Sequence, residues 1–288
     1  MSAEIKYTAI CRNNQLLIFD GLSAAEKQTG RWLYEDVSDF ANSIGRYNYC
    51  TRYLVKSKVM LVALLKEIEN ECRAGVLFPA LHFECHGDPE KGLWLASSNE
   101  HISWHDLAQL VAPINSAARN NVSLILATCH GFVIREAVNL KAPCPFHFMI
   151  APSQEVSAGV VYDSFVPFYK EMISTGELNA AILHLNERFE RFIAGEWFYT
   201  AIARFYINSY SYKDKQEIIN LIIDDEVAKA GYRNHELVRA ARAKAKKVVS
   251  SPRQFYMELE KAFLHGRSMV SYEDIKKFID HHKKSKGN

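Results

Sequence analysis

Two stretches of the sequence, LHFECHGD at residues 81–88 and SLILATCHG at residues 123–131, decide the fold. Each is a short apolar run, typical of a buried strand, that ends in a histidine followed by a glycine. In open α/β sheets the carboxyl ends of the strands line the ligand crevice. If these two strands are neighbours in one sheet, the imidazole of His86 and the thiol of Cys129 face one another across a single cleft.

Cysteine, histidine and glycine at these strand ends are the residue types of a nucleophilic dyad. A thiol attacks only as the thiolate, and its pKa falls beside an imidazole or at a helix N-terminus. We expect Cys129 to have both, with a helix at 131–140. His86 would accept the thiol proton and later donate a proton to the leaving amine, while the N–H groups of Gly87 and Cys129 stabilise the oxyanion. This chemistry needs no cofactor, and we expect none.

The first 178 residues alternate between strand and helix patterns. Short apolar runs predict strands at 15–19, 49–55, 81–85, 122–128 and 146–151, and a hairpin at 92–104. Helical spacing of apolar residues predicts helices at 32–44, 59–72, 105–111 and 162–174. Such alternation is typical of an α/β fold with a mostly parallel, centrally buried sheet.

The pattern and the charge both change towards the C-terminus. Only helices are predicted there, at 180–192, 197–206, 216–230, 236–249, 254–264 and 272–281. Residues 1–194 carry 17 Lys and Arg against 21 Asp and Glu, a net charge of −4, whereas residues 195–288 carry 18 against 12, a net charge of +6. We therefore expect an α/β domain at 1–193 and a basic, all-helical domain at 194–288.

The composition excludes several classes of protein. The 288 residues are 48% hydrophobic and 24% charged, which is typical of a globular protein and not of a disordered or fibrous one. No apolar run approaches the roughly 18 residues that span a bilayer, and the N-terminus does not resemble a signal peptide. The six cysteines include no CxxC pair and are too sparse for a disulfide scaffold. We expect a protein of the reducing cytoplasm with no membrane partner.

A metal site is the weaker interpretation of the same histidines and cysteines. Cys85 and His86 are adjacent in a strand and should point to opposite faces. His101 and His105 lie four residues apart, but no third ligand is evident. We therefore expect surface histidines and no metal.

The order of these elements resembles a known family. A strand into His-Gly, a hairpin, a helix and a strand into Ala-Thr-Cys-His-Gly resemble the caspase-like cysteine peptidases of clan CD, particularly the metacaspase-like and bacterial CHAT-domain proteins. The stretch FMIAPSQEVSAGVVYDSFVPFYKEMISTGELNAAI, residues 148–182, continues the likeness, with an aromatic pair at Phe168-Tyr169 and a helix bounded by Gly176. The resemblance covers residues 15–185 and implies a caspase-like three-layer sandwich.

The resemblance also implies roles for individual residues. His86 corresponds to the general base and Cys129 to the nucleophile of a cysteine endopeptidase, and Gly87 with Cys129 corresponds to the oxyanion hole. By analogy with CHAT-domain proteins, the enzyme would be a regulated effector in a bacterial antiviral defence or cell-death pathway. The rival interpretation is a catalytically inactive scaffold that keeps the fold.

The substrate pocket departs from the family pattern. Two residues before the nucleophile, where caspases have Gln and metacaspases Asp, this chain has Ala127. Two acids could line the pocket for the P1 side chain instead: Asp20, at the end of the first strand, and Glu155, after the strand that follows the nucleophile. A basic P1 residue is favoured if either points inward, and a small or apolar one if both are solvated.

The helical domain carries two further features. A cluster of cations that includes Arg239, Arg242 and Lys246 forms either a solvated helix face or a patch for nucleic acid, a nucleotide or an acidic protein. The aromatic run forms either core between the domains or a partner-binding face, and comprises Trp197, Phe198, Tyr199, Phe205, Tyr206, Tyr210 and Tyr212. We expect this domain to bind an activating or inhibiting protein, and the α/β domain to act on a protein substrate.

Overall fold

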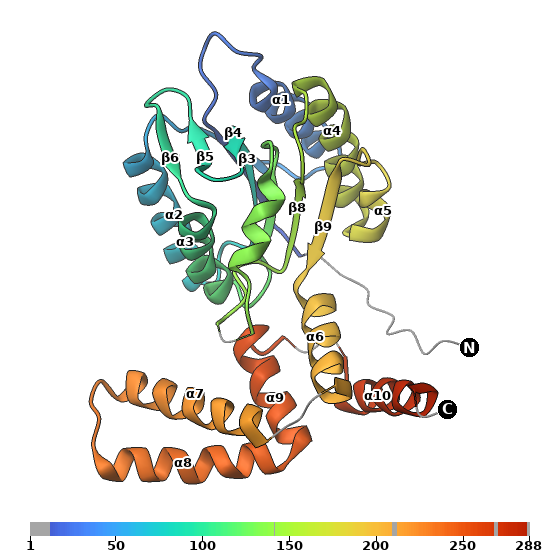
Figure 1. Cartoon of the computed structure of the whole chain (residues 1–288). Coiled ribbons are helices and arrows are strands. Elements are labelled where there is room, and N and C mark those ends of the chain that lie inside the picture. Colours follow the sequence, from blue (N-terminus) through green and yellow to red (C-terminus); the bar gives the residue numbers. More distant parts are fainter. Residues whose placement is uncertain (1–11, 141, 209–211, 268–269, 287–288) are drawn as a thin grey trace. The chain divides into compact units, whose positions relative to one another are not determined.

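The computed structural model describes residues 12–140, 142–208, 212–267 and 270–286, and the chain divides into two compact units. The α/β unit contains the described residues from 12 to 139 and from 143 to 194, and the helical unit contains Leu140, Ala142 and the described residues from Gly195 onward. Figure 1 shows the strands gathered in the first unit and helices α7 to α10 in the second. The sequence placed the boundary between 193 and 194.

A six-stranded sheet forms the centre of the α/β unit, in the order β2-β1-β3-β7-β8-β9. Its strands are β1 (Gln15–Asp20), β2 (Cys50–Leu54), β3 (Pro79–Glu84), β7 (Ser123–Leu126), β8 (Phe148–Pro152) and β9 (Phe189–Ile193). All neighbours are parallel except β8 and β9. Every residue of β3, β7 and β8 is buried, as expected for central strands covered on both faces.

Helices cover both faces of this sheet. Figure 1 shows α1 (Thr29–Ser43) and α4 (Ala158–Thr175) on one face, and α2 (Lys58–Arg73) and α3 (Trp104–Ala117) on the other. Serine side chains cap α2, α3 and α4 by accepting a hydrogen bond from a first-turn N–H, and Gly176 ends α4 in the left-handed conformation. The predicted mixed α/β fold with a mostly parallel sheet is confirmed.

A second, three-stranded antiparallel sheet is formed by β4 (His86–Asp88), β5 (Gly92–Leu95) and β6 (Glu100–Ile102). The last two are the predicted hairpin at 92–104. The sequence did not predict β4, which follows β3 after a single residue, Cys85. Its residues pair with β5, so that His86 lies opposite Trp94.

The prediction of a helix at 180–192 was wrong. Helix α5 is short (Leu178–Ile182), and the chain then forms the edge strand β9. Aromatic residues at 189 and 192 have helical spacing, which misled the prediction, but the two rings lie on opposite faces of the strand. Phe189 packs edge-on against Phe165, with ring centroids 4.9 Å apart, and Phe192 against Phe146 at 5.5 Å. Pairing with β8 thus overrides local propensity.

The helical unit contains α6 (Ala194–Asn208), α7 (Tyr212–Ala230), α8 (His235–Ser250), α9 (Pro252–Phe263) and α10 (Tyr272–Lys286). Helices α7 and α8 lie side by side (Figure 1), and a shared apolar cluster of Ile219, Ile223, Ala241, Ala245 and Val249 joins them. None of the described helices combines the length and the hydropathy needed to cross a bilayer.

Part of the aromatic run forms core within the helical unit. Phe198 and Tyr199 of α6 are buried against Tyr256 of α9, and Phe198 also stacks on Phe263. Both tyrosine hydroxyls donate to the buried carboxylate of Glu260, at 2.8 and 2.9 Å. Tyr210 and the side chains of Phe205, Tyr206 and Tyr212 lie outside the described part of the chain.

Candidate active site

The start of β4 and the end of β7 meet at the carboxyl end of the parallel strands. A Cβ atom placed on Gly87 would lie 2.0 Å from the carbonyl oxygen of Cys129 and 2.8 Å from Oγ1 of Thr128. Real Cβ atoms do not approach other atoms so closely, so only glycine fits at position 87. The backbone next to His86 therefore lies directly against Cys129.

The imidazole of His86 is held on two sides. Its Nε2 is hydrogen-bonded to Oε1 of Glu26, which lies in the loop between β1 and α1. Its ring also packs on Trp94 of β5, with centroids 4.9 Å apart, and Trp94 stacks on His101 at 6.2 Å. The side chains of His86 and Glu26 are 39% and 32% exposed, so solvent and substrate can reach both.

Cys129 is half-buried, and its sulfur contacts the loop that follows β8. The N–H of Val156 donates to Sγ at 3.4 Å, and the thiol donates to the carbonyl oxygen of Val156 at 3.7 Å. In the described structure no hydrogen bond joins the Cys129 sulfur to the His86 ring, so the thiol is bound to Val156 and not to the imidazole.

The segment after Cys129 differs from the expected helix at 131–140. It is a seven-residue 3-10 helix, Gly131–Ala137, entered through His130 with φ at 57°. A Cβ on Gly131 would lie 2.9 Å from the Cβ of Leu126, so this turn folds back tightly on β7. The helix is too short to carry the dipole effect that the sequence suggested for the thiol.

The other described cysteines are poor nucleophiles. Cys50, Cys72, Cys85 and Cys144 are buried, and Cys129 alone among the described cysteines is partly exposed. Burial raises the pKa of Cys50 to about 11 and those of Cys72 and Cys144 to about 12, and it raises the pKa of Cys85 further still. Cys11 lies outside the described residues.

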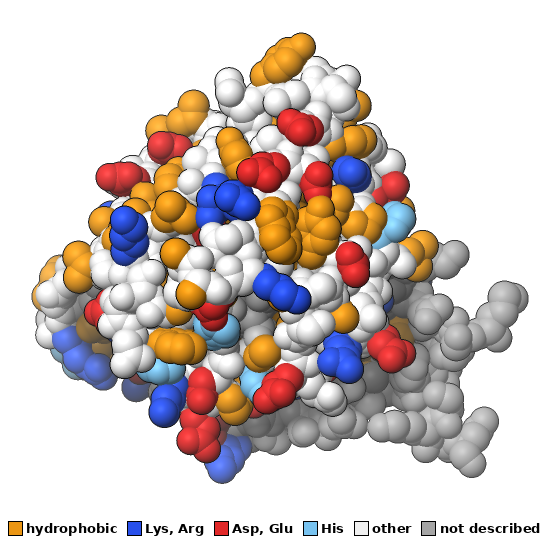
Figure 2. Space-filling view, turned by 90° about the horizontal axis from the view of Figure 1, so that it is seen from above, with side chains coloured by type: hydrophobic (Ala, Val, Ile, Leu, Met, Phe, Trp, Pro, Cys, Tyr) orange, Lys and Arg blue, Asp and Glu red, His pale blue; other side chains and the backbone are white. Residues whose placement is uncertain are grey.

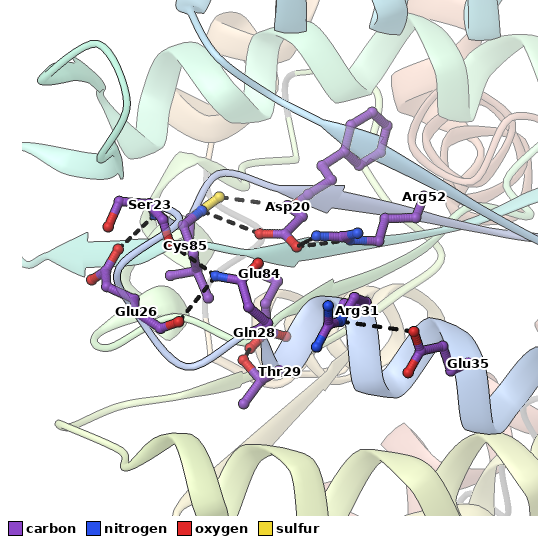
Figure 3. A network of polar contacts seen from close by, with 12 residues as sticks. Asp20, Ser23, Glu26, Gln28, Thr29, Arg31, Glu35, Arg52, Glu84 and Cys85 are labelled. Carbon is purple, nitrogen blue, oxygen red and sulfur yellow. Dashed lines mark hydrogen bonds and ion pairs between the residues drawn. The ribbon is translucent and has the colours of Figure 1, made fainter.

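The two candidate P1 acids are in different surroundings. Asp20 is buried, and Figure 3 shows its carboxylate facing Arg52: Oδ2 accepts from Nε at 2.8 Å and from Nη2 at 2.6 Å. Glu155 is exposed and directly precedes Val156, which contacts the Cys129 sulfur. The charge of Asp20 is thus neutralised within the protein, whereas Glu155 is open to solvent. Ala127 is buried.

The described residues include no cluster of three or more His, Cys, Asp or Glu side chains that could hold a metal ion. His101 and His105 are exposed, and Nε2 of His105 pairs with Gln109 of the same helix. The Cys85 sulfur lies in the interior, 3.8 Å from the carbonyl oxygen of Phe19. It therefore cannot bind the same metal ion as His86, which lies at the surface.

The face of the unit at which the parallel strands end is chemically mixed. In Figure 2, which views the molecule from above Figure 1, acidic, basic and histidine side chains are interspersed among hydrophobic ones on the described surface. Neither sign of charge dominates the described surface in this view.

The cations of α8 are exposed on one side of the helix. Arg239, Arg242 and Lys246 follow the spacing i, i+3, i+7, and within the described part of the chain none of them has an ion-pair partner. Lys244, on another side of α8, is paired with Glu226 at 2.8 Å, and this hydrogen bond raises the pKa of the lysine.

Sequence reasoning missed Glu26 and Val156. Neither lies in a motif, because each belongs to a loop whose path is set by tertiary contacts. A usable signal for Glu26 was its place six residues after Asp20, which ends an apolar strand near the sheet edge where His86 was expected.

Neither a family model nor a curated protein matches this sequence. Among solved structures, the chain is similar to Raptor from Chaetomium thermophilum, with a TM-score of 0.35 and 10% identity over 97% of this chain and 29% of that chain. The chain thus spans less than a third of the Raptor chain. A likeness at this TM-score establishes neither fold nor function.

Proposed function

We propose that the α/β unit is a caspase-like cysteine endopeptidase in which Cys129 is the nucleophile and His86 the general base. The observation that carries the proposal is the backbone contact between Gly87 and the Cys129 carbonyl, which makes the two strand ends neighbours. It is supported by the partial exposure of Cys129, since the other described cysteines are buried. The histidine is likewise accessible.

The reaction would proceed by acyl transfer. His86 takes the proton of the Cys129 thiol, and the thiolate sulfur forms a bond to the carbonyl carbon of the scissile peptide. The carbonyl oxygen becomes an oxyanion, which the N–H groups of Gly87 and Cys129 stabilise. The C–N bond then breaks, the amine leaves with a proton from the imidazolium, and water hydrolyses the thioester with His86 again acting as base.

Val156 would stabilise the nucleophile in this scheme. Its N–H already donates a hydrogen bond to the sulfur, and the same donor would face the sulfur after the thiol proton has left. The thiol hydrogen bond to the Val156 carbonyl must be given up when the proton passes to His86. A small rotation of the Cys129 side chain is therefore part of the proposed activation, and binding of a substrate or a partner protein would supply it.

For the P1 side chain we propose Arg or Lys, selected by Glu155. This carboxylate is exposed one residue from the contact with the Cys129 sulfur; the Arg188 guanidinium donates to the Glu155 backbone carbonyl oxygen at 3.2 Å, but within the described residues it forms no ion pair with the carboxylate. Asp20 is the weaker candidate, because Arg52 already binds its carboxylate. To bind Asp20, the guanidinium of a substrate arginine would have to displace the guanidinium of Arg52.

The proposal is tested by labelling Cys129 with an arginyl chloromethyl ketone and locating the adduct by peptide mass spectrometry. We expect an adduct at Cys129 in the wild type, none in Cys129→Ala, and a rate at least about 100-fold lower in His86→Ala, as for loss of a general base. The matched control is His101→Ala, which removes an exposed histidine near the same tryptophan. Equal labelling in His86→Ala and the wild type would exclude the dyad, and a wild type unlabelled even with cell extract favours an inactive scaffold.

A second candidate function is anion binding through α8. The specific observation is the exposed, unneutralised row of Arg239, Arg242 and Lys246 in the described structure. Such a row attracts a phosphate-bearing ligand or an acidic protein surface. We propose that the helical unit uses it to bind a regulatory partner, with nucleic acid or a nucleotide as the alternative ligand.

A further inference from the structure

The carboxylate of Glu26 is oriented by its own loop before it reaches His86. Its Oε2 accepts a hydrogen bond from the N–H of Ser23 at 2.6 Å, while its Oε1 contacts Nε2 of His86. Gln28 fastens the same loop, since its Nε2 donates to the carbonyl oxygens of Ser23 at 2.9 Å and of Glu26 at 3.0 Å. Figure 3 shows Ser23, Glu26 and Gln28 close together in one turn. Both carboxylate oxygens therefore have fixed directions.

The loop itself is fastened to the strands on either side of it. The N–H of Gly21 donates to the carbonyl oxygen of Glu84, and Gly21 in turn accepts from the N–H of Ala96. The N–H of Leu22 donates to Asp20, whose other carboxylate oxygen is bound by Arg52. This anchoring sets the position of Glu26 relative to β3 and β5, the elements that also position His86. The carboxylate–imidazole contact is thus built into the fold.

Glu26 is ionised at neutral pH. Burial by itself raises the pKa of this carboxyl, but the hydrogen bonds from Ser23 and His86 outweigh it, and the pKa lies below its ordinary value. An ionised carboxylate only accepts hydrogen bonds, so the His86 nitrogen that faces it carries the hydrogen. The lone pair of the neutral imidazole then resides on Nδ1.

We propose that Glu26 is the positioning residue of the general base, fixing His86 as the Nε2–H tautomer with Nδ1 free to accept the thiol proton. This inference rests on the proposed peptidase function for its catalytic meaning, but the tautomer of His86 can be measured without it. The carboxylate also stabilises the imidazolium formed when the thiol is deprotonated. Three other groups surround the His86 ring. The uncharged Trp94 packs on the ring, His101 stacks on Trp94, and Cys129 lies beyond Gly87.

The test compares wild type, Glu26→Gln and Glu26→Asp by two readouts. Nitrogen-15 NMR of the histidine rings gives the tautomer of His86, assigned with His86→Ala. The second readout is the rate at which iodoacetamide alkylates Cys129, measured as a function of pH by peptide mass spectrometry. This rate reports the ion pair between the Cys129 thiolate and the His86 imidazolium. Glu35→Gln is the matched control, because Glu35 of α1 pairs with exposed Arg31.

In Glu26→Gln we expect the preference for the Nε2–H tautomer of His86 to be lost, since the ionised acceptor that faces Nε2 is removed. We also expect Cys129 alkylation near neutral pH to be about tenfold slower. Glu26→Asp should recover part of both, and Glu35→Gln should change neither. An unchanged His86 tautomer in Glu26→Gln would overturn the inference.

The two proposals fail separately. If Glu26→Gln changes the tautomer of His86 but leaves Cys129 alkylation untouched, Glu26 positions the imidazole and the dyad is absent. If alkylation depends on His86 but neither readout responds to Glu26→Gln, the dyad stands and Glu26 has no positioning role. Because the Gln side chain is nearly isosteric, the loop that holds it is retained; its thermal unfolding, followed by circular dichroism, verifies this.

Discussion

Gly87 and Cys129 are in backbone contact, because the carbonyl oxygen of Cys129 occupies the space that a Cβ on residue 87 would need. We predict that Gly87→Ala separates β4 from the end of β7 and moves His86 away from the thiol. Overpacking of this kind costs about 1 to 3 kcal/mol, so the variant should still fold. Chloromethyl ketone labelling of Cys129 should nevertheless fall at least about tenfold.

The control for this substitution is Gly159→Ala. Gly159 lies in α4, and a Cβ there would meet no atom within 4 Å. It should preserve labelling and stabilise the fold by up to about 1 kcal/mol through helix propensity. Wild-type labelling in Gly87→Ala would show that the close approach of the two strand ends is not needed for the reactivity of Cys129.

Asp20 and Arg52 form a buried ion pair, with side chains 1% and 16% exposed. We predict that Arg52→Ala lowers the free energy of unfolding by about 3 to 5 kcal/mol, because it leaves an uncompensated carboxylate inside the protein. Arg31→Ala, which breaks an exposed pair with Glu35, should cost under about 1 kcal/mol. Urea denaturation measures both, and equal effects would show that the Asp20 carboxylate is solvated.

The sequence was sufficient for the parts of the fold that are determined by local periodicity. The apolar spacing in 59–72 predicted α2 to within a residue at each end, and the run VSLILAT placed β7 and thus Cys129. It failed for β9, because an edge strand with aromatic residues at helical spacing is specified by pairing with β8 and not by its own residues.

The residues of the candidate site likewise divide into those that the sequence could predict and those that it could not. His86 and Cys129 could be predicted because each follows a recognisable strand, and parallel strands end at one edge. Glu26 could not, because its carboxylate reaches His86 only through the turn that Ser23 and Gln28 fasten. Nor could the sequence foresee that Arg52 would neutralise Asp20, since that pair joins two strands 32 residues apart.

Glu69 provides a pH-dependent test of the fold. It lies in α2 and is bound by Lys66 and Arg73; the hydrogen bond from Lys66 is the main reason that its pKa is lowered. A group with a lowered folded-state pKa stabilises the protein above its ordinary pKa, near 4.3 for Glu, and loses that contribution as the pH falls through the folded value. Glu69→Gln should therefore be less stable than wild type at pH 7, by under about 1 kcal/mol.

The same difference should shrink as the pH falls below about 4, because the wild-type carboxyl is then protonated as well. Urea unfolding of both proteins at pH 7, 5 and 3 measures it. A difference that is constant across this range would show that the ion pairs of Glu69 contribute nothing and that the substitution acts through packing alone.

The cations on α8 predict a salt-dependent interaction if they bind a phosphate-bearing ligand. Replacing Arg239, Arg242 and Lys246 by Gln should weaken binding of a single-stranded oligonucleotide and reduce the slope of log K against log salt by about 0.7 for each phosphate that is no longer neutralised. Lys244→Gln is the control, because Lys244 is already paired with Glu226. Fluorescence anisotropy between 50 mM and 200 mM salt, a range in which this slope is readily seen, measures both. No binding by the wild type leaves an acidic protein partner as the ligand of this helix face.

The choice of P1 residue tests the acids around the nucleophile. Because Glu155 is exposed beside Val156 while Asp20 is neutralised by Arg52, we predict that Glu155→Ala lowers kcat/KM for substrates with Arg or Lys at P1 by about tenfold, corresponding to about 1.4 kcal/mol of charge-assisted hydrogen bonding. Glu190→Ala, an exposed acid on β9, is the matched control and should leave kcat/KM unchanged. A set of peptides that differ only at P1 measures the effect. If the wild type prefers Leu, Ala or Asp at P1, or if Glu155→Ala cleaves basic substrates as well as the wild type does, Glu155 does not select the substrate, and the proposed dyad is unaffected.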